Sequence, residues 1–330
     1  YLVNDRLDLL VRRRLQGEAF ALRAWFQWDL LQKFGGKGVN GQMLGFPIVT
    51  EPVDITGNIN FARNTYDECV KQIIADCDSA YKYLPIAHRD FLASPSDLTY
   101  AGGRYWGRMD GITTRAIKAN VYLTWASPRF NPANDVTRWD SAAVNAKKVM
   151  DFKLTVDNVN ATTGFKPVTA VNWFDPNFPG IVISSRYNTA NDVMEKMFYP
   201  GGFQGNGVIG ATQELVDAFP MANGYPITDL VNSGYNPATP YAGRDPRLAL
   251  YIVYNGVTFA GSTISINAGS ITGDQVNYIK TSTRTGYYLK KLSREDVRLN
   301  PTSQVTKAHY VPKIRYTELL LIYAEAANEA

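Results

Sequence analysis

Few residues of this chain are arranged for catalysis or metal binding. Its 330 residues include two histidines, His88 and His309, and two cysteines, too few for a Cys/His zinc cluster. Neither histidine stands in an H-E-x-x-H metal motif or beside a G-x-S-x-G nucleophile turn. Glu325 and Glu329 lie one helical turn apart, but such a pair more often forms a solvated face. The sequence therefore predicts no enzyme, no metal centre and no cofactor.

A glycine-rich stretch, Gly36-Lys-Gly38-Val-Asn-Gly41, has the spacing of a dinucleotide-binding loop. That site needs a strand before the glycines and a helix after them, so that the helix N-terminus meets the pyrophosphate. Here a predicted helix precedes the stretch and an extended segment containing Pro47 follows it. The order is wrong, and we expect a flexible loop.

Aromatic side chains outside the periodic segments are more informative. The chain has 20 tyrosines, 15 phenylalanines and 6 tryptophans. A ring on a loop can cover the C–H face of a sugar while neighbouring amides and carboxylates meet its hydroxyls. Each ring could instead pack its loop onto the core. The rings in such stretches are Trp106, Trp173, Phe174, Tyr187, Phe203, Tyr225, Tyr235 and Tyr241.

The charge pattern argues against nucleic-acid binding. The net charge is +4, and the basic residues are scattered apart from the run at 12–14, which has acidic neighbours. A nucleic-acid footprint needs a basic stripe. No apolar run reaches the roughly 18 residues of a membrane span. The chain begins at Tyr1 with neither Met nor a signal peptide, so we expect the true N-terminus to lie upstream.

Five segments have the 3.6-residue period of helices that bury one face. In the first, Ala19, Leu22, Phe26 and Leu30 share an apolar face. Long neighbouring helices rich in Ala and Tyr suggest helix pairs of the tetratricopeptide type. The predicted helices span 4–33, 65–83, 112–126, 141–150 and 315–330.

The last helix raises the question of what covers it. Leu319, Ile322, Tyr323 and Ala326 form an apolar stripe, and no cap follows Glu329. We expect a covering helix beyond the last residue, and a chain of 1–330 that is less stable alone than a longer protein.

Between the fourth and fifth helices the sequence becomes irregular. Short β-like runs at 180–185, 248–254 and 286–291 are separated by Asn, Gly, Pro, Ser and Thr. No linker sequence separates the helical segments from this irregular region. We predict a mainly α fold, with a scaffold of tetratricopeptide-like helix pairs and a long loop-rich insertion containing short strands. The single domain would have its scaffold at 1–152 and 313–330 and an irregular ligand-side region at 153–312.

Five segments, in order, resemble the SusD/RagB-like family of nutrient-binding outer-membrane lipoproteins of Bacteroidetes. Each is weak alone, but together they span nearly the whole chain. They are the GEAFALRAW run at 17–25 with Phe34-Gly35, the TQELVDAF run at 212–219 with Asn223-Gly224, Arg244-Asp-Pro-Arg-Leu with Tyr254-Asn-Gly, the TGYYLKK run at 285–291, and the RYTELLLIYAEA run at 315–326.

The resemblance implies a non-catalytic cell-surface protein that binds oligo- or polysaccharide. It implies a partner, a SusC-like TonB-dependent transporter, and attachment to the external face of the outer membrane through a lipidated N-terminus. It also implies a SusD-like domain that is incomplete at both ends. Two alternatives stay open: a peptide- or protein-binding helical-repeat scaffold, and, less favoured, a secreted glycoside hydrolase, for which two of the 30 acidic residues would suffice.

We expect the ligand contacts in the loop at 224–243. It joins two family-like segments, so its ends are anchored while its middle is free to vary. It presents Tyr225, Tyr235 and Tyr241 near Asn236, and tyrosine offers a large contact area with few rotatable bonds. Trp173 is the next candidate.

Overall fold

A computed structural model gives the fold. It describes residues 6–54, 56, 57, 59–89, 98–159, 178, 180–185, 190–267, 274–277, 279–291 and 293–330. The fold is mainly α, as predicted, with only short strands. The chain forms two compact units: unit 1 comprises Tyr1–Phe165, Pro179–Ser185 and Pro312–Ala330, and unit 2 comprises Lys166–Phe178 and Arg186–Val311. These bounds lie close to those expected for the scaffold and the irregular region. That the two form one domain stays a prediction.

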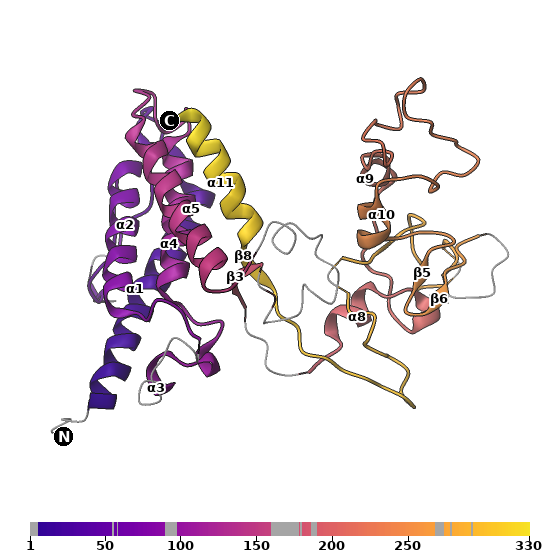
Figure 1. Cartoon of the computed structure of the whole chain (residues 1–330), viewed down its shortest axis with the longest axis horizontal. Coiled ribbons are helices and arrows are strands. Elements are labelled where there is room, and N and C mark those ends of the chain that lie inside the picture. The colour runs from indigo at the N-terminus through magenta and orange to yellow at the C-terminus, as the bar shows by residue number, and fades with distance from the viewer. Residues whose placement is uncertain are drawn as a thin grey trace. The chain divides into compact units, whose positions relative to one another are not determined.

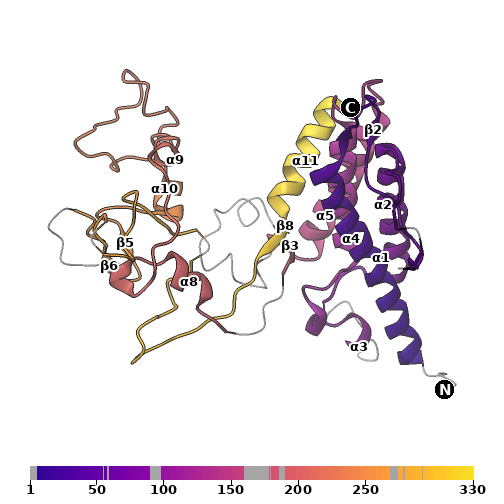
Figure 2. The ribbon, with the colours of Figure 1, turned by 180° about the vertical axis from the view of Figure 1, so that it is seen from behind.

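Unit 1 is a row of packed helices (Figures 1 and 2). All five predicted helices are present, with shifted ends: α1 Arg6–Phe34, α2 Tyr66–Tyr83, α4 Gly111–Ala126, α5 Thr137–Thr155 and α11 Tyr316–Glu329. A short α3 at Leu98–Ala101 and a 3₁₀ turn at Gly103–Tyr105 lie between α2 and α4 in the chain. Each long helix packs on the next one: α1 on α2, α2 on α4, α4 on α5, and α5 on α11.

The buried face of α1 differs from the predicted one. Leu22, Phe26 and Leu30 are 42%, 61% and 41% exposed, and Ala19 is exposed as well. The buried face instead carries Ala21, Ala24, Trp28 and Leu31. Both sets of residues have helical spacing, so the period alone could not choose between them. The small alanines let α2 approach closely.

The stripe on α11 is already covered within the chain. Leu319 and Ala326 are fully buried and Ile322 is 3% exposed, because α11 packs along α5. The expectation that this stripe needs a covering helix beyond the last residue was wrong. The argument for lower stability of residues 1–330 loses its basis with it.

Helix α2 begins with a reciprocal pair of hydrogen bonds. The Thr65 hydroxyl accepts from the backbone N–H of Glu68 at 3.2 Å, and the Glu68 carboxylate accepts from the N–H of Thr65 at 2.8 Å. Two of the four otherwise unpaired N–H groups of the first turn are thereby satisfied.

Replacing Thr65 with alanine is expected to lower the free energy of unfolding of unit 1 by about 1 kcal/mol, since one capped N–H loses its acceptor. Denaturant titration followed by far-ultraviolet circular dichroism measures the change. Lys71→Ala, on an exposed part of the same helix, is the control and should change stability by less than about 0.5 kcal/mol. Equal stability of Thr65→Ala and the parent would contradict the role of the cap.

The glycine-rich stretch is a hairpin, so the prediction of a flexible loop was wrong. Strand β1, Gly36–Lys37, pairs antiparallel with β2, Met43–Leu44. The Gly38 N–H donates to the Gln42 carbonyl at 2.8 Å and closes the turn. Gly41 has φ 80°, a conformation that glycine adopts without strain. This arrangement excludes a dinucleotide loop, as the sequence order predicted.

The strands are short and lie mostly in the loop-rich part of the chain. All three β-like runs contain a strand: β3 at Ile181–Ser184 pairs with β8 at Pro312–Arg315, and β7 at Tyr288–Leu289 pairs with β4 at Ile252–Val253. The run at 248–254 was only partly right, because helix α10, Pro246–Tyr251, takes its first four residues and leaves β4 as its strand. Asp245 caps that helix and Pro246 occupies its first turn, which favours a helix start.

Unit 2 also contains α8 at Val193–Phe198, a 3₁₀ turn at Gly201–Phe203, α9 at Gln213–Asp217, and the hairpin of β5, Thr258–Phe259, with β6, Ser262–Thr263. Its side chains form two apolar clusters. One surrounds Phe259 and Tyr288, and the other surrounds Leu248 and Tyr287. None of the helices in the described part of the chain is long and apolar enough to cross a membrane.

Candidate ligand site

The loop at 224–243 is clamped at its base, as its position between two family-like segments suggested. Met221 and Arg244 form an isolated β-bridge. The buried guanidinium of Arg244 donates to the carbonyls of Val216 at 2.6 Å and Phe219 at 2.7 Å. The loop rises from α9 and α10 (Figure 1), so one arginine fixes its root while its middle reaches solvent.

The candidate residues of this loop have different surroundings. Tyr225 is 46% exposed, and Tyr235 is half-buried, with the Arg244 guanidinium carbon 5.7 Å from its ring centroid. The exposed Asn236 uses its side-chain oxygen to accept from the Ala238 N–H at 2.9 Å, which stabilises the turn. Trp173 lies outside the described residues.

Tyr241 faces inward. Its ring stacks on Tyr254 with centroids 4.3 Å apart, and its hydroxyl lies 3.2 Å from that of Tyr287. Burial, followed by the contact with Tyr287, raises the pKa of Tyr241. These contacts pack the loop onto the core of unit 2, and a ligand contact by Tyr241 stays a prediction.

A cavity of about 510 Å³ opens elsewhere in unit 2. Three segments line it: 199–204, Ala260 and 295–305. Apolar, mostly buried side chains meet exposed polar ones there, the combination that ligand pockets use for contact area and orientation. The apolar side chains are those of Tyr199, Phe203, Val297, Leu299 and Val305, and the exposed polar ones are those of Gln204, Asp296, Arg298, Asn300 and Ser303.

Three aromatic rings hold the apolar part of this cavity in place. Phe259 is fully buried and meets Tyr199 edge to face at 4.9 Å and Phe203 at 5.4 Å. Such contacts favour one ring orientation. Phe203 is half-buried, so a rigidly held ring is partly open to the cavity.

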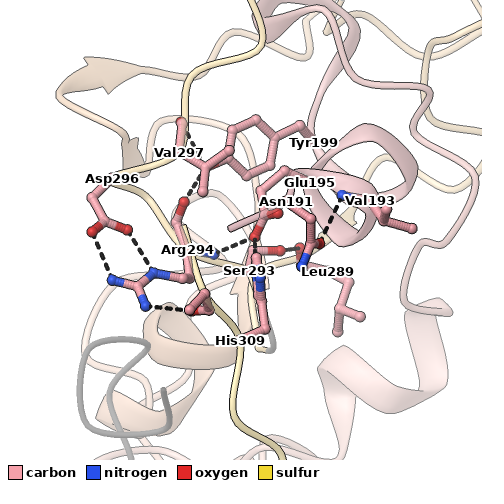
Figure 3. A network of polar contacts seen from close by, with 11 residues as sticks. Asn191, Val193, Glu195, Tyr199, Leu289, Ser293, Arg294, Asp296, Val297 and His309 are labelled. Carbon is pink, nitrogen blue, oxygen red and sulfur yellow. Dashed lines mark hydrogen bonds and ion pairs between the residues drawn. The ribbon is translucent and has the colours of Figure 1, made fainter. Parts of the chain in front are cut away.

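A polar network around the buried Glu195 fixes the chain beside the cavity (Figure 3). The fully buried Glu195 carboxylate accepts from the Arg294 N–H at 2.9 Å and from His309 Nε2 at 3.0 Å. The Arg294 guanidinium donates to both oxygens of Asp296 at 2.9 and 2.8 Å. The Tyr199 hydroxyl donates to the Arg294 carbonyl. The network therefore ties α8 to the segment that carries Asp296.

Both carboxylates of the cavity are engaged by protein groups. Glu295 accepts from the Ala260 N–H at 2.8 Å and pairs with Lys290 at 3.1 Å. The hydrogen bonds from Arg294 lower the pKa of Asp296, which keeps it ionised and makes it a poor general acid. The arrangement suits binding better than hydrolysis.

Two residues of the cavity have left-handed backbone conformations. Gln204 has φ 63° and Ala260 has φ 47°. Residues other than glycine rarely adopt this region, at a cost of about 1–3 kcal/mol each, and such residues cluster at ligand clamps. Among the cavity residues, only Phe203 was a sequence candidate, through its place in a glycine-rich stretch. The others come from distant segments, and the sequence held no signal that would group them.

The chain matches two protein-family models. Residues 178–330 match the SusD family, and residues 3–97 match a SusD-like model described as starch-binding and associating with the outer membrane. A comparison with curated protein sequences finds no match. In described parts of the chain, no group of three or more His, Cys, Asp or Glu is placed to hold a metal ion.

Solved structures show the same fold. A SusD-like protein from Bacteroides fragilis is 25% identical with a TM-score of 0.67, over 99% of this chain and 59% of its own. A SusD-like carbohydrate-binding protein from the same species is 19% identical with a TM-score of 0.65, over 96% and 55%. Surface glycan-binding protein A from Bacteroides uniformis is 15% identical with a TM-score of 0.58, over 98% and 56%. The chain thus spans less than two thirds of the length of these relatives. On these matches, the chain belongs to the SusD/RagB-like family.

Proposed function

We propose that this protein captures an oligo- or polysaccharide without cleaving it and passes it to a SusC-like TonB-dependent transporter. It would act on the external face of the outer membrane, held there by a lipidated N-terminus. The observation that carries the proposal is the cavity of unit 2, in which the held ring of Phe203 faces exposed amide and hydroxyl groups in a chain of the SusD/RagB-like family.

The side chains around the cavity match what a sugar presents. A pyranose ring has an apolar C–H face and a rim of hydroxyls, and an aromatic ring covers the first while amides and hydroxyls bond the second. Phe203 offers the ring, and Gln204, Asn300 and Ser303 offer the polar groups. A preformed wall loses little conformational entropy on binding.

A glycan array tests the proposal, with a peptide pull-down and a reducing-sugar assay beside it. We expect binding to at least one glycan and no release of reducing ends from it. Peptide binding without glycan binding would favour the helical-repeat scaffold. Cleavage that one carboxylate substitution abolishes would favour the glycoside hydrolase.

The loop at 224–243 is proposed as a second contact surface for the same glycan. Tyr225→Ala and Tyr235→Ala should each weaken binding about tenfold, or about 1.4 kcal/mol, with little loss of stability, because both rings are partly exposed. Tyr241→Ala, whose ring packs inward, should lower the melting temperature as well. Titration calorimetry and thermal melts on the three variants, with Trp173→Ala and Asn236→Ala beside them, separate contact from packing. Normal affinity in all five would place the site outside this loop.

A further inference from the structure

The acidic side chains of the cavity are paired with cations, whereas a basic side chain that lines it has no such partner in the part of the chain that the structure describes. Its two carboxylates, Glu295 and Asp296, pair with Lys290 and Arg294, and Lys307 lies 3.8 Å from Asp296 as a second cation. Arg298 lines the same cavity. Within the described residues, its guanidinium has neither an ion pair nor a hydrogen bond, and its side chain is exposed. The uncompensated charge of the cavity is therefore positive.

Arg298 is held by its backbone rather than by its side chain. Its N–H donates to the Val305 carbonyl and its carbonyl accepts from the Val305 N–H, both at 3.0 Å. The Asn300 side chain accepts from the Thr302 N–H at 3.0 Å and closes the turn between the two segments. The root of the arginine is thus fixed beside the cavity, while five N–H donors stay available to a ligand.

We propose that the cavity selects a sugar that carries a carboxylate, a uronic or a sialic acid, and that Arg298 binds this carboxylate. A guanidinium matches a carboxylate through two parallel hydrogen bonds, which are stronger than bonds between neutral groups. The sugar ring would lie against Phe203 while its carboxylate binds Arg298, so that each residue recognises a different part of the sugar. The inference rests on the proposed glycan binding and names the class of glycan.

The neighbouring carboxylates set the geometry of this site. An acidic ligand near Glu295 and Asp296 would be repelled if they were bare, but three cations already compensate the two negative charges. Arg298 then adds a positive charge that no described carboxylate of the cavity has paired. A neutral sugar can accept hydrogen bonds from Arg298 through its hydroxyls but forms no ion pair, so it gains less from that charge.

The test uses an array of neutral, uronic-acid, sialylated and sulfated glycans, followed by calorimetry on matched pairs. Oligogalacturonate and sialyllactose are each compared with their methyl ester, which removes the charge and keeps the ring and linkage. We expect the acidic member of one pair to bind at least tenfold more tightly than its neutral counterpart. The pair that shows the difference tells a uronic acid from a sialic acid. We also expect the affinity to fall with added salt.

Variants at Arg298 assign the effect to this side chain. Arg298→Gln should lose about tenfold in affinity for the acidic ligand and its salt dependence, and should bind the neutral counterpart within twofold of the parent. Arg298→Lys should recover part of the loss. Arg284→Gln, in the same unit and outside the cavity, should behave as the parent.

The outcomes separate the inference from the function on which it rests. Binding to neutral glycans alone, to sulfated glycans alone, or equally to both members of every pair would overturn the preference for a carboxylate and leave glycan capture standing. An acidic preference that Arg298→Gln leaves intact would overturn the role of Arg298. Binding to no glycan at all would overturn the proposed function itself.

Discussion

Replacing Glu195 with alanine should lower the free energy of unfolding of unit 2 by about 3–5 kcal/mol. The substitution leaves two donors, the buried His309 Nε2 and the partly buried Arg294 N–H, without the acceptor they share. Each unsatisfied donor costs about 1–3 kcal/mol, and the lost side-chain volume adds a cavity term. Glycan affinity should fall as well, because the segment from Arg294 to Val297 would keep only the hydrogen bonds from Tyr199 and lose the one to Glu195 of α8.

Native-state hydrogen exchange measures this change with an internal control, because the amides of unit 1 should keep their protection while those at 293–299 lose theirs. Glu195→Gln is the matched variant. Its amide oxygen can still accept both hydrogen bonds, so a loss of only about 1–2 kcal/mol is expected. Equal exchange in Glu195→Ala and the parent would show that the network in Figure 3 does not hold the cavity wall.

The helices of unit 1 could be predicted because each carries an apolar period, and some also carry a stop signal. Pro85 follows α2 and Pro128 follows α4. The orientation of α1 could not be predicted, since its residues offer two apolar faces and only the approach of α2 selects one. The sequence also did not show that α5 covers Leu319 on α11, because the two helices are far apart in the chain.

The candidate site was less accessible to sequence reasoning. The loop at 224–243 stands out because its tyrosines and prolines are close together in the chain. The cavity has no such local signature, since Tyr199 and Val297 are brought together by a hydroxyl-to-carbonyl hydrogen bond across 98 residues. Phe203 could be named as a candidate because its ring lies in a glycine-rich stretch. The role of Arg298 could not be inferred from the sequence, since it depends on which neighbouring cations pair with the carboxylates in the folded structure.

Phe203→Ala is expected to weaken glycan binding about thirtyfold, or about 2 kcal/mol, because the sugar loses its apolar platform. The same substitution removes contacts with Tyr199 and Phe259, so some stability is lost too. Phe203→Leu separates the two effects. Leucine keeps most of the apolar contact with the cluster but has no flat face, so the protein should stay nearly as stable and still bind about tenfold more weakly.

Phe61→Ala is the control for this series, since Phe61 is 49% exposed and lies in unit 1, outside the cavity. Calorimetry with the glycan found on the array should give it the affinity of the parent. Parent-like binding by Phe203→Leu would mean that no sugar stacks on Phe203. If Tyr235→Ala then lost affinity while Phe203→Leu did not, the aromatic platform would lie in the loop at 224–243. The cavity would then contribute to binding only through its charged groups. Loss in both would mean that one glycan reaches from the loop to the cavity, because each ring is held by its own set of contacts and neither substitution disturbs the other's.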